Sequence, residues 1–147
     1  MQKILIVVVL SLCFAVAKRV WWAVEDEMFP VDETAWAEEA DAWVAEDLAG
    51  GTVADARHWL QQEGNAIWGG DSQDVQALVD DVYASGAPNV WFTGLEEYEG
   101  KTLTASIAIE LPASGIAREQ IFQREAVFWG SDPTPDVGQK YLAIYLD

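Results

Sequence analysis

Apolar residues that recur every three or four positions predict four helices in this chain. The pattern is clearest after Gly70, where five apolar side chains take the positions i, i+3, i+4, i+7 and i+8 of one helical face. These five are Val75, Leu78, Val79, Val82 and Tyr83. Weaker stripes predict helices over residues 32–50, 52–64 and 114–129, each with a glycine at or just after its end.

Shorter apolar or alternating segments predict four strands. They cover residues 65–68, 90–93, 102–111 and 141–146. In segment 102–111, Leu103, Ile107 and Ile109 alternate with polar or small residues, so one face of that strand is apolar. The residues between the second and third strands, 96–101, are polar and centre on Gly100, which predicts a turn.

From residue 65 onward the expected order of elements is β-α-β-β-α-β. This order is typical of a ferredoxin-like βαββαβ sandwich, in which two helices cover one face of a four-stranded antiparallel sheet. We therefore predict an α+β domain over residues 32–147, with two N-terminal helices in residues 32–64 and a ferredoxin-like core in residues 65–147. The second face of the sheet needs a cover, and we expect Trp36 and Trp43 to pack on it.

The first 31 residues have a different character from this domain. Residues 4–17 are an unbroken run of apolar and small residues between basic residues, and residues 18–31 form an acidic linker. The run predicts a secretory signal cleaved after Ala17 or a retained membrane anchor, with a buried strand as the third interpretation. Trp21 and Trp22 then lie at a membrane surface if the run is retained. The first two interpretations place the domain outside the cytoplasm or at a membrane face.

The chain is strongly acidic, because 25 Asp and Glu residues against 8 Lys and Arg residues give a formal net charge of -17. Such a surface repels phosphate backbones, so we expect no nucleic-acid partner. The acidic side chains are interpreted as a solvated face, with a basic partner or bound cations as the alternative. Glu96, Glu97 and Glu99 are candidate ligands for a weak Ca²⁺ site, although a solvated turn explains them more simply.

Few residues are suited to catalysis. His58 is the single histidine, and the single cysteine lies in the apolar run at the N-terminus, so no transition-metal site is expected. The segment Gly70-Asp71-Ser72 resembles the serine block of GDSL-type hydrolases, a resemblance that implies a nucleophilic role for Ser72. The Asp-x-x-His segment of those enzymes is missing, and helix capping by Asp71 or Ser72 explains the same residues. We predict no catalytic residue, no metal and no cofactor.

Eight tryptophans are the other unusual feature of the composition. We predict that Trp21, Trp22, Trp36 and Trp43 bind a partner, because exposed indoles are frequent at protein interfaces. The resulting hypothesis is a non-enzymatic, exported or membrane-anchored accessory module that docks a protein partner in the cell envelope, with membrane contact through residues 4–17 if they are retained. The alternative is a small-ligand or cation-binding domain, and a hydrolase using Ser72 is a weaker third. A contiguous apolar patch favours the first function, and a concave pocket with polar groups favours the second.

Overall fold

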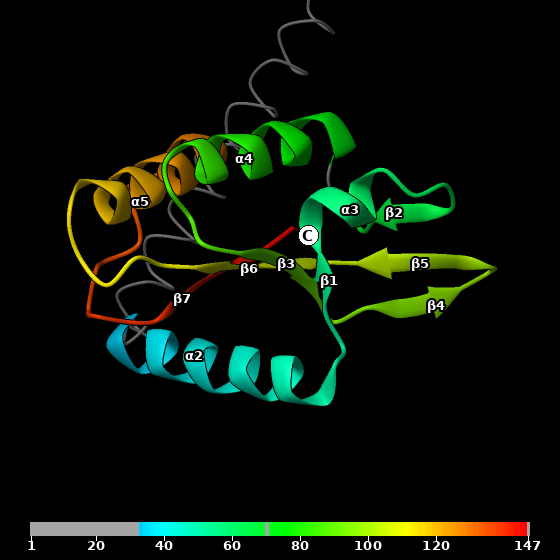
Figure 1. The fold of residues 1–147 in the computed structure, drawn as a ribbon, viewed down its shortest axis with the longest axis horizontal. Helices are drawn as coiled ribbons and strands as arrows, with labels where there is room; N and C mark the ends of the chain where they lie inside the picture. The colour runs from blue at the N-terminus through cyan, green and yellow to red at the C-terminus, as the bar shows by residue number, and fades with distance from the viewer. Residues whose placement is uncertain (1–32, 70, 147) are drawn as a thin grey trace, which may run out of the picture. The chain divides into compact units, whose positions relative to one another are not determined.

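A computed structural model describes residues 33–69 and 71–146. The predictions for residues 1–17 and 18–31, including those for Trp21 and Trp22, lie outside the described residues. Within the described part, the predicted α+β fold with a four-stranded antiparallel sheet is confirmed, and a second sheet of three strands accompanies it (Figure 1). No helix in this part of the chain is long and apolar enough to cross a membrane.

Helices and strands are interspersed along the chain. The helices are α2 (Glu33–Gly50), α3 (Ala56–Leu60), α4 (Ser72–Ala84) and α5 (Ile116–Trp129). The strands are β1 (Ala54–Asp55), β2 (Asn65–Ile67), β3 (Val90–Thr93), β4 (Glu96–Tyr98), β5 (Lys101–Thr104), β6 (Ser106–Glu110) and β7 (Tyr141–Tyr145). The larger sheet has the order β1-β3-β6-β7 and the smaller sheet the order β2-β5-β4.

The larger sheet is covered on both faces, by α4 and α5 on one side and by α2 on the other (Figure 1). Strand β6 shows how the sequence divides between the two sides, because successive side chains of a strand point to opposite faces. Ile107 and Ile109 belong to the core formed with α4 and α5. Ala108, between them, belongs to a smaller cluster with Val44 of α2 and Tyr141 of β7.

The sheet topology differs from the predicted ferredoxin-like arrangement, which requires segment 65–68 in the same sheet as the other three strands. Instead, β2 pairs in parallel with β5 in the smaller sheet, and β1 pairs with β3 at the edge of the larger one. The cause is a break in the predicted strand 102–111 at Ala105. The Thr104 and Ala105 carbonyls accept hydrogen bonds, both of 2.7 Å, from the Trp68 and Leu146 amides respectively. The two halves of the segment therefore have different neighbours.

Three buried hydroxyl side chains stabilise this break. Thr104 Oγ1 donates to the Thr93 carbonyl at 2.8 Å and contacts the Ser106 carbonyl at 3.1 Å. The Thr93 and Ser106 hydroxyls lie 2.8 Å apart. Buried polar groups need such partners, so the three residues satisfy one another where the strand leaves one sheet for the other.

Two local predictions need correction. The predicted turn over residues 96–101 is a hairpin in which only Glu99 and Gly100 form the turn, with φ angles of 50° and 77°. Two consecutive positive φ angles are typical of a type I′ hairpin turn. The helix predicted from residue 52 begins only at Ala56, because the Asp55 carboxylate accepts a 2.8 Å hydrogen bond from the His58 amide and caps α3 there.

Helix α2 is attached to β7 by polar and aromatic contacts. The Asp41 carboxylate accepts hydrogen bonds of 2.7 Å from the backbone amides of both Lys140 and Tyr141. The rings of Trp36 and Trp43 lie with centroids 5.7 and 6.1 Å from the Tyr145 ring. The prediction that these two tryptophans pack on the second face of the sheet is confirmed.

Candidate functional site

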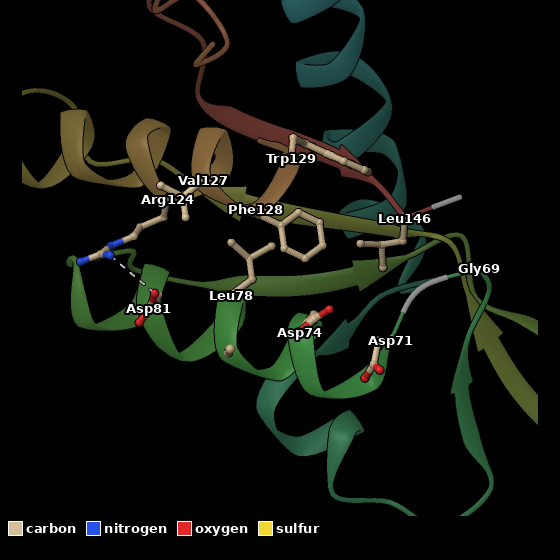
Figure 2. A pocket seen from close by; sticks show the side chains of 11 residues that line it. Gly69, Asp71, Asp74, Leu78, Asp81, Arg124, Val127, Phe128, Trp129 and Leu146 are labelled. Atoms are coloured by element: carbon tan, nitrogen blue, oxygen red, sulfur yellow. Dashed lines mark ion pairs between the residues drawn. The ribbon is translucent and has the colours of Figure 1, made fainter. Parts of the chain in front are cut away.

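A groove of about 550 Å³ lies between α4, the C-terminal end of α5 and the residue that follows β7 (Figure 2). Its apolar lining comes from three elements far apart in the sequence. Leu78 belongs to α4, the residues 127–129 are the end of α5, and Leu146 follows β7. Leu78 and Phe128 point toward one another across the groove (Figure 2). The helical stripe that builds the core thus also supplies part of the groove.

Carboxylates from α4 give the groove a negative charge. Asp71, Asp74 and Asp81 all line it, and Arg124 of α5 is the one basic side chain among its described lining residues. Arg124 lies 3.6 Å from Asp81 in an exposed ion pair that joins the two helices (Figure 2). Asp71 Oδ1 also accepts a 2.7 Å hydrogen bond from the Gln73 amide and caps α4. Asp74 therefore faces the groove without a basic neighbour among the described lining residues.

The rim of the groove exposes apolar side chains that the core does not use. Val127 is 75% exposed and Trp129 is 44% exposed, although both lie in the last turn of α5. The Trp129 ring packs on Phe128, with centroids 5.1 Å apart and the planes nearly perpendicular. Large exposed apolar side chains beside a concave surface are typical of a binding site.

The tryptophans predicted to bind a partner lie elsewhere. Trp36 and Trp43 are on the α2 side of the sheet and share Tyr145 as a neighbour, whereas the groove is on the α4 and α5 side. Trp43 is half-buried, and its Nε1 is a buried donor without a hydrogen-bond partner among residues 33–69 and 71–146. Sequence reasoning missed the groove, although a signal existed. Val127 and Trp129 fall outside the apolar stripe of α5, which is where a helix presents side chains to solvent.

The residues considered for other chemistry are also separate from the groove lining. Ser72 is the first residue of α4 and is exposed, while the cap of that helix is Asp71. The His58 ring lies 2.9 Å from the Gln62 amide nitrogen. The glutamates of the β4–β5 hairpin are exposed, and within residues 33–69 and 71–146 no group of three or more His, Cys, Asp or Glu side chains is placed to hold a metal ion.

Comparisons of the chain with protein-family models, with curated protein sequences and with solved structures give no match. The side chains of the described surface therefore supply the whole basis for assigning a function. Two of its properties bear on binding: the apolar rim at Val127 and Trp129, and the excess of carboxylates beneath it.

Proposed function

We propose that this domain is a non-enzymatic interaction module that binds an amphipathic segment of a protein partner in the groove between α4 and α5. The observation that carries the proposal is the exposure of Val127 and Trp129 at the edge of an apolar groove. A partner segment that buries them removes apolar surface from water, at about 25 cal/mol per Å². An indole at the edge of a groove is also a frequent anchor of protein interfaces.

The charge of the groove defines the chemistry of the partner. Three carboxylates face one guanidinium, and that guanidinium already pairs with Asp81. A segment that combines apolar side chains with Lys or Arg complements this arrangement, and the overall charge of -17 would accelerate its approach. Helices that lay an apolar face into a groove are a common form of such recognition.

The location of the module in the cell is part of the same proposal. Residues 4–17 act as a signal or anchor, so the domain meets its partner in the cell envelope. The intact mass of the native protein distinguishes a cleaved signal from a retained anchor, because cleavage after Ala17 leaves a chain that begins at Lys18. A native chain that keeps residues 1–17 and stays in the cytosol would contradict the envelope location without affecting the groove.

Site-specific photocrosslinking in the native cell tests the groove. A photoreactive amino acid at position 127 is expected to capture a segment that is apolar and carries Lys or Arg, identified by mass spectrometry of the crosslinked peptide. The same probe at position 116 is the matched control, because Ile116 is 72% exposed on the same helix but lies outside the groove lining. Capture of the same segment from both positions would contradict the proposal.

Binding by the identified partner then provides a second readout. Val127→Asp replaces an apolar contact at the rim with a carboxylate that the partner would have to desolvate, and it is expected to weaken binding about tenfold or more, by analogy with interface anchors. Ile116→Asp makes the same chemical change at similar exposure and is expected to leave binding unchanged. Equal affinity of the two variants would place the interface elsewhere, with the surface at Trp36 and Trp43 as the next candidate.

A further inference from the structure

A second hollow, of about 240 Å³, lies at the smaller sheet, and none of its described lining residues belongs to the groove. Its wall consists of Trp68, Gly94, Glu96, Leu103, Thr104 and Ala105. Trp68 is 51% exposed, which is unusual for the largest apolar side chain. The Trp68 amide donates a 2.7 Å hydrogen bond to the Thr104 carbonyl and so continues the ladder of β2.

The Trp68 ring lies beside the ring of Tyr98. Its centroid lies 6.3 Å from that of Tyr98, and the two ring planes are 84° apart. In such an edge-to-face pair, the edge of one ring covers a single face of the other. Tyr98 therefore covers at most one face of the indole, and Trp68 as a whole is 51% exposed.

The sheet register places a carboxylate beside this indole. Glu96 is opposite Leu103, so the two side chains share a face of the sheet, and both line the hollow. Glu97 is opposite Thr102 and points to the other face. None of the described lining residues is basic. The hollow thus combines a half-exposed indole with one negative charge, while Lys101, opposite Tyr98 on the same face of the sheet, is not among its described lining residues.

We propose that this hollow binds a small organic cation of the alkylammonium class, with its charged head over Trp68 and Glu96 as the counter-charge. Indole is the best natural ring for cation–π contacts, and alkylated ammonium ions give up their hydration shell readily enough to make them. The single charged side chain of the wall has the matching sign. This proposal does not rest on the groove function, because the two sites have no described lining residue in common.

Other ligands fit these features less well. A purely apolar ligand leaves Glu96 without a counter-charge. An anionic ligand meets both Glu96 and the net charge of -17. The volume of about 240 Å³ also limits the ligand to a small molecule, since sites for drug-sized ligands are typically larger.

Choline is a suitable probe, because 3,3-dimethylbutan-1-ol has the same shape without the charge. Each is titrated into the full chain at constant ionic strength, and binding is followed by the NMR shift of the Trp68 indole N–H, assigned with Trp68→Phe. We expect a saturable shift with choline and a much smaller one with the alcohol. Equal shifts with choline and with the alcohol would show that the site is merely apolar. An equal shift with NaCl in place of choline would show general screening of the acidic surface. Either result, or no shift with choline, overturns the proposal.

Two isosteric variants separate a site from general electrostatics. Glu96→Gln and Glu97→Gln remove the same charge from the same strand, but from opposite faces. We expect Glu96→Gln to weaken choline binding about two- to fivefold, the range of an exposed charge pair, and Glu97→Gln to leave it unchanged. Trp68→Ala is expected to weaken it about tenfold or more. Equal effects of the two glutamine variants overturn the proposal, whereas the groove remains testable through Val127 alone.

Discussion

The two faces of the larger sheet are held to their helices by different kinds of interaction. Toward α4 and α5, the sheet presents fully buried aliphatic side chains such as Ile107 and Ile144, which meet the apolar stripe of α4. Toward α2, the buried cluster is small and its border is aromatic. There the Asp41 carboxylate provides directional hydrogen bonds to two backbone amides of β7. Buried apolar area holds α4 and α5 to the sheet, whereas a few hydrogen bonds and ring contacts hold α2 to it.

The same contrast appears within the α5 side. The loop of residues 130–140 that leads from α5 to β7 has few apolar side chains, and buried ionic groups of α5 hold it instead. Arg118 is only 6% exposed and donates two hydrogen bonds, of 2.7 and 2.6 Å, to Asp136. Glu125, two turns later, accepts hydrogen bonds from the amide and hydroxyl of Thr134. Ion pairs and hydrogen bonds thus hold this loop, where the sequence has few apolar side chains to bury.

The strongest test of this contrast uses two adjacent, fully buried residues of β6. Ile107→Asp buries an unpaired carboxylate in the main core and is expected to prevent folding. Ala108→Asp places the same group under α2, and we expect it to release that helix while the rest of the domain stays folded. Far-UV circular dichroism and hydrogen exchange distinguish the outcomes. If Ala108→Asp unfolds the whole domain, the α2 layer is as essential as the main core.

The sequence contains enough local information for several elements. Strand β3 has its predicted bounds, Val90–Thr93, and α4, Ser72–Ala84, contains the whole predicted stripe from Val75 to Tyr83. Both have a clear period and a nearby stop signal, such as the Ala87-Pro88-Asn89 segment before β3. Local periodicity, however, does not specify which strands pair. The sheet order was therefore the part of the prediction that failed.

Two other features depended on distant partners. The alternation of residues 102–111 continues through Ala105, so the segment itself contains no signal for the break. The break is stabilised by Thr93, which lies 11 residues before Thr104 in the sequence. Arg118 and Glu125 occupy inward positions of α5 and are seven residues apart, a signal that could have indicated a buried ionic anchor. The groove was missed for the same reason, because its lining comes from α4, α5 and the end of β7.

Loss of the buried guanidinium is expected to have the second largest effect. Arg118→Met leaves the carbonyls of Pro112 and Gln139 without their donor, and we expect a loss of about 2–4 kcal/mol in the free energy of unfolding. Arg124→Met is the matched control on the same helix, where the exposed ion pair with Asp81 should contribute at most about 1 kcal/mol. Denaturant unfolding measures both. Similar losses for the two variants would mean that Arg118 stabilises the loop of residues 130–140 no more than an exposed ion pair does.

The pH dependence of the same pair has a defined sign. Hydrogen bonds from Arg118 hold the pKa of the Asp136 carboxyl below its ordinary value. A lowered pKa in the folded state contributes stability above the unfolded-state pKa, about 4, and that contribution is lost as the pH falls through the folded-state pKa. The difference in stability between the native chain and Arg118→Met should therefore shrink below about pH 4. A constant difference would assign the effect to packing alone.

The smallest expected effect concerns the polar attachment of α2. Asp41→Asn keeps one acceptor oxygen but replaces the second with a donor, so one of the Lys140 and Tyr141 amides loses its side-chain partner. We expect about 1 kcal/mol of local destabilisation, seen as faster hydrogen exchange in α2 while α4 and α5 keep their protection. Glu38→Gln makes the same change of charge at an exposed position of the same helix and should leave exchange unaltered. If Asp41→Asn also leaves exchange in α2 unaltered, the apolar and aromatic contacts of α2 hold that helix to the sheet without help from this carboxylate.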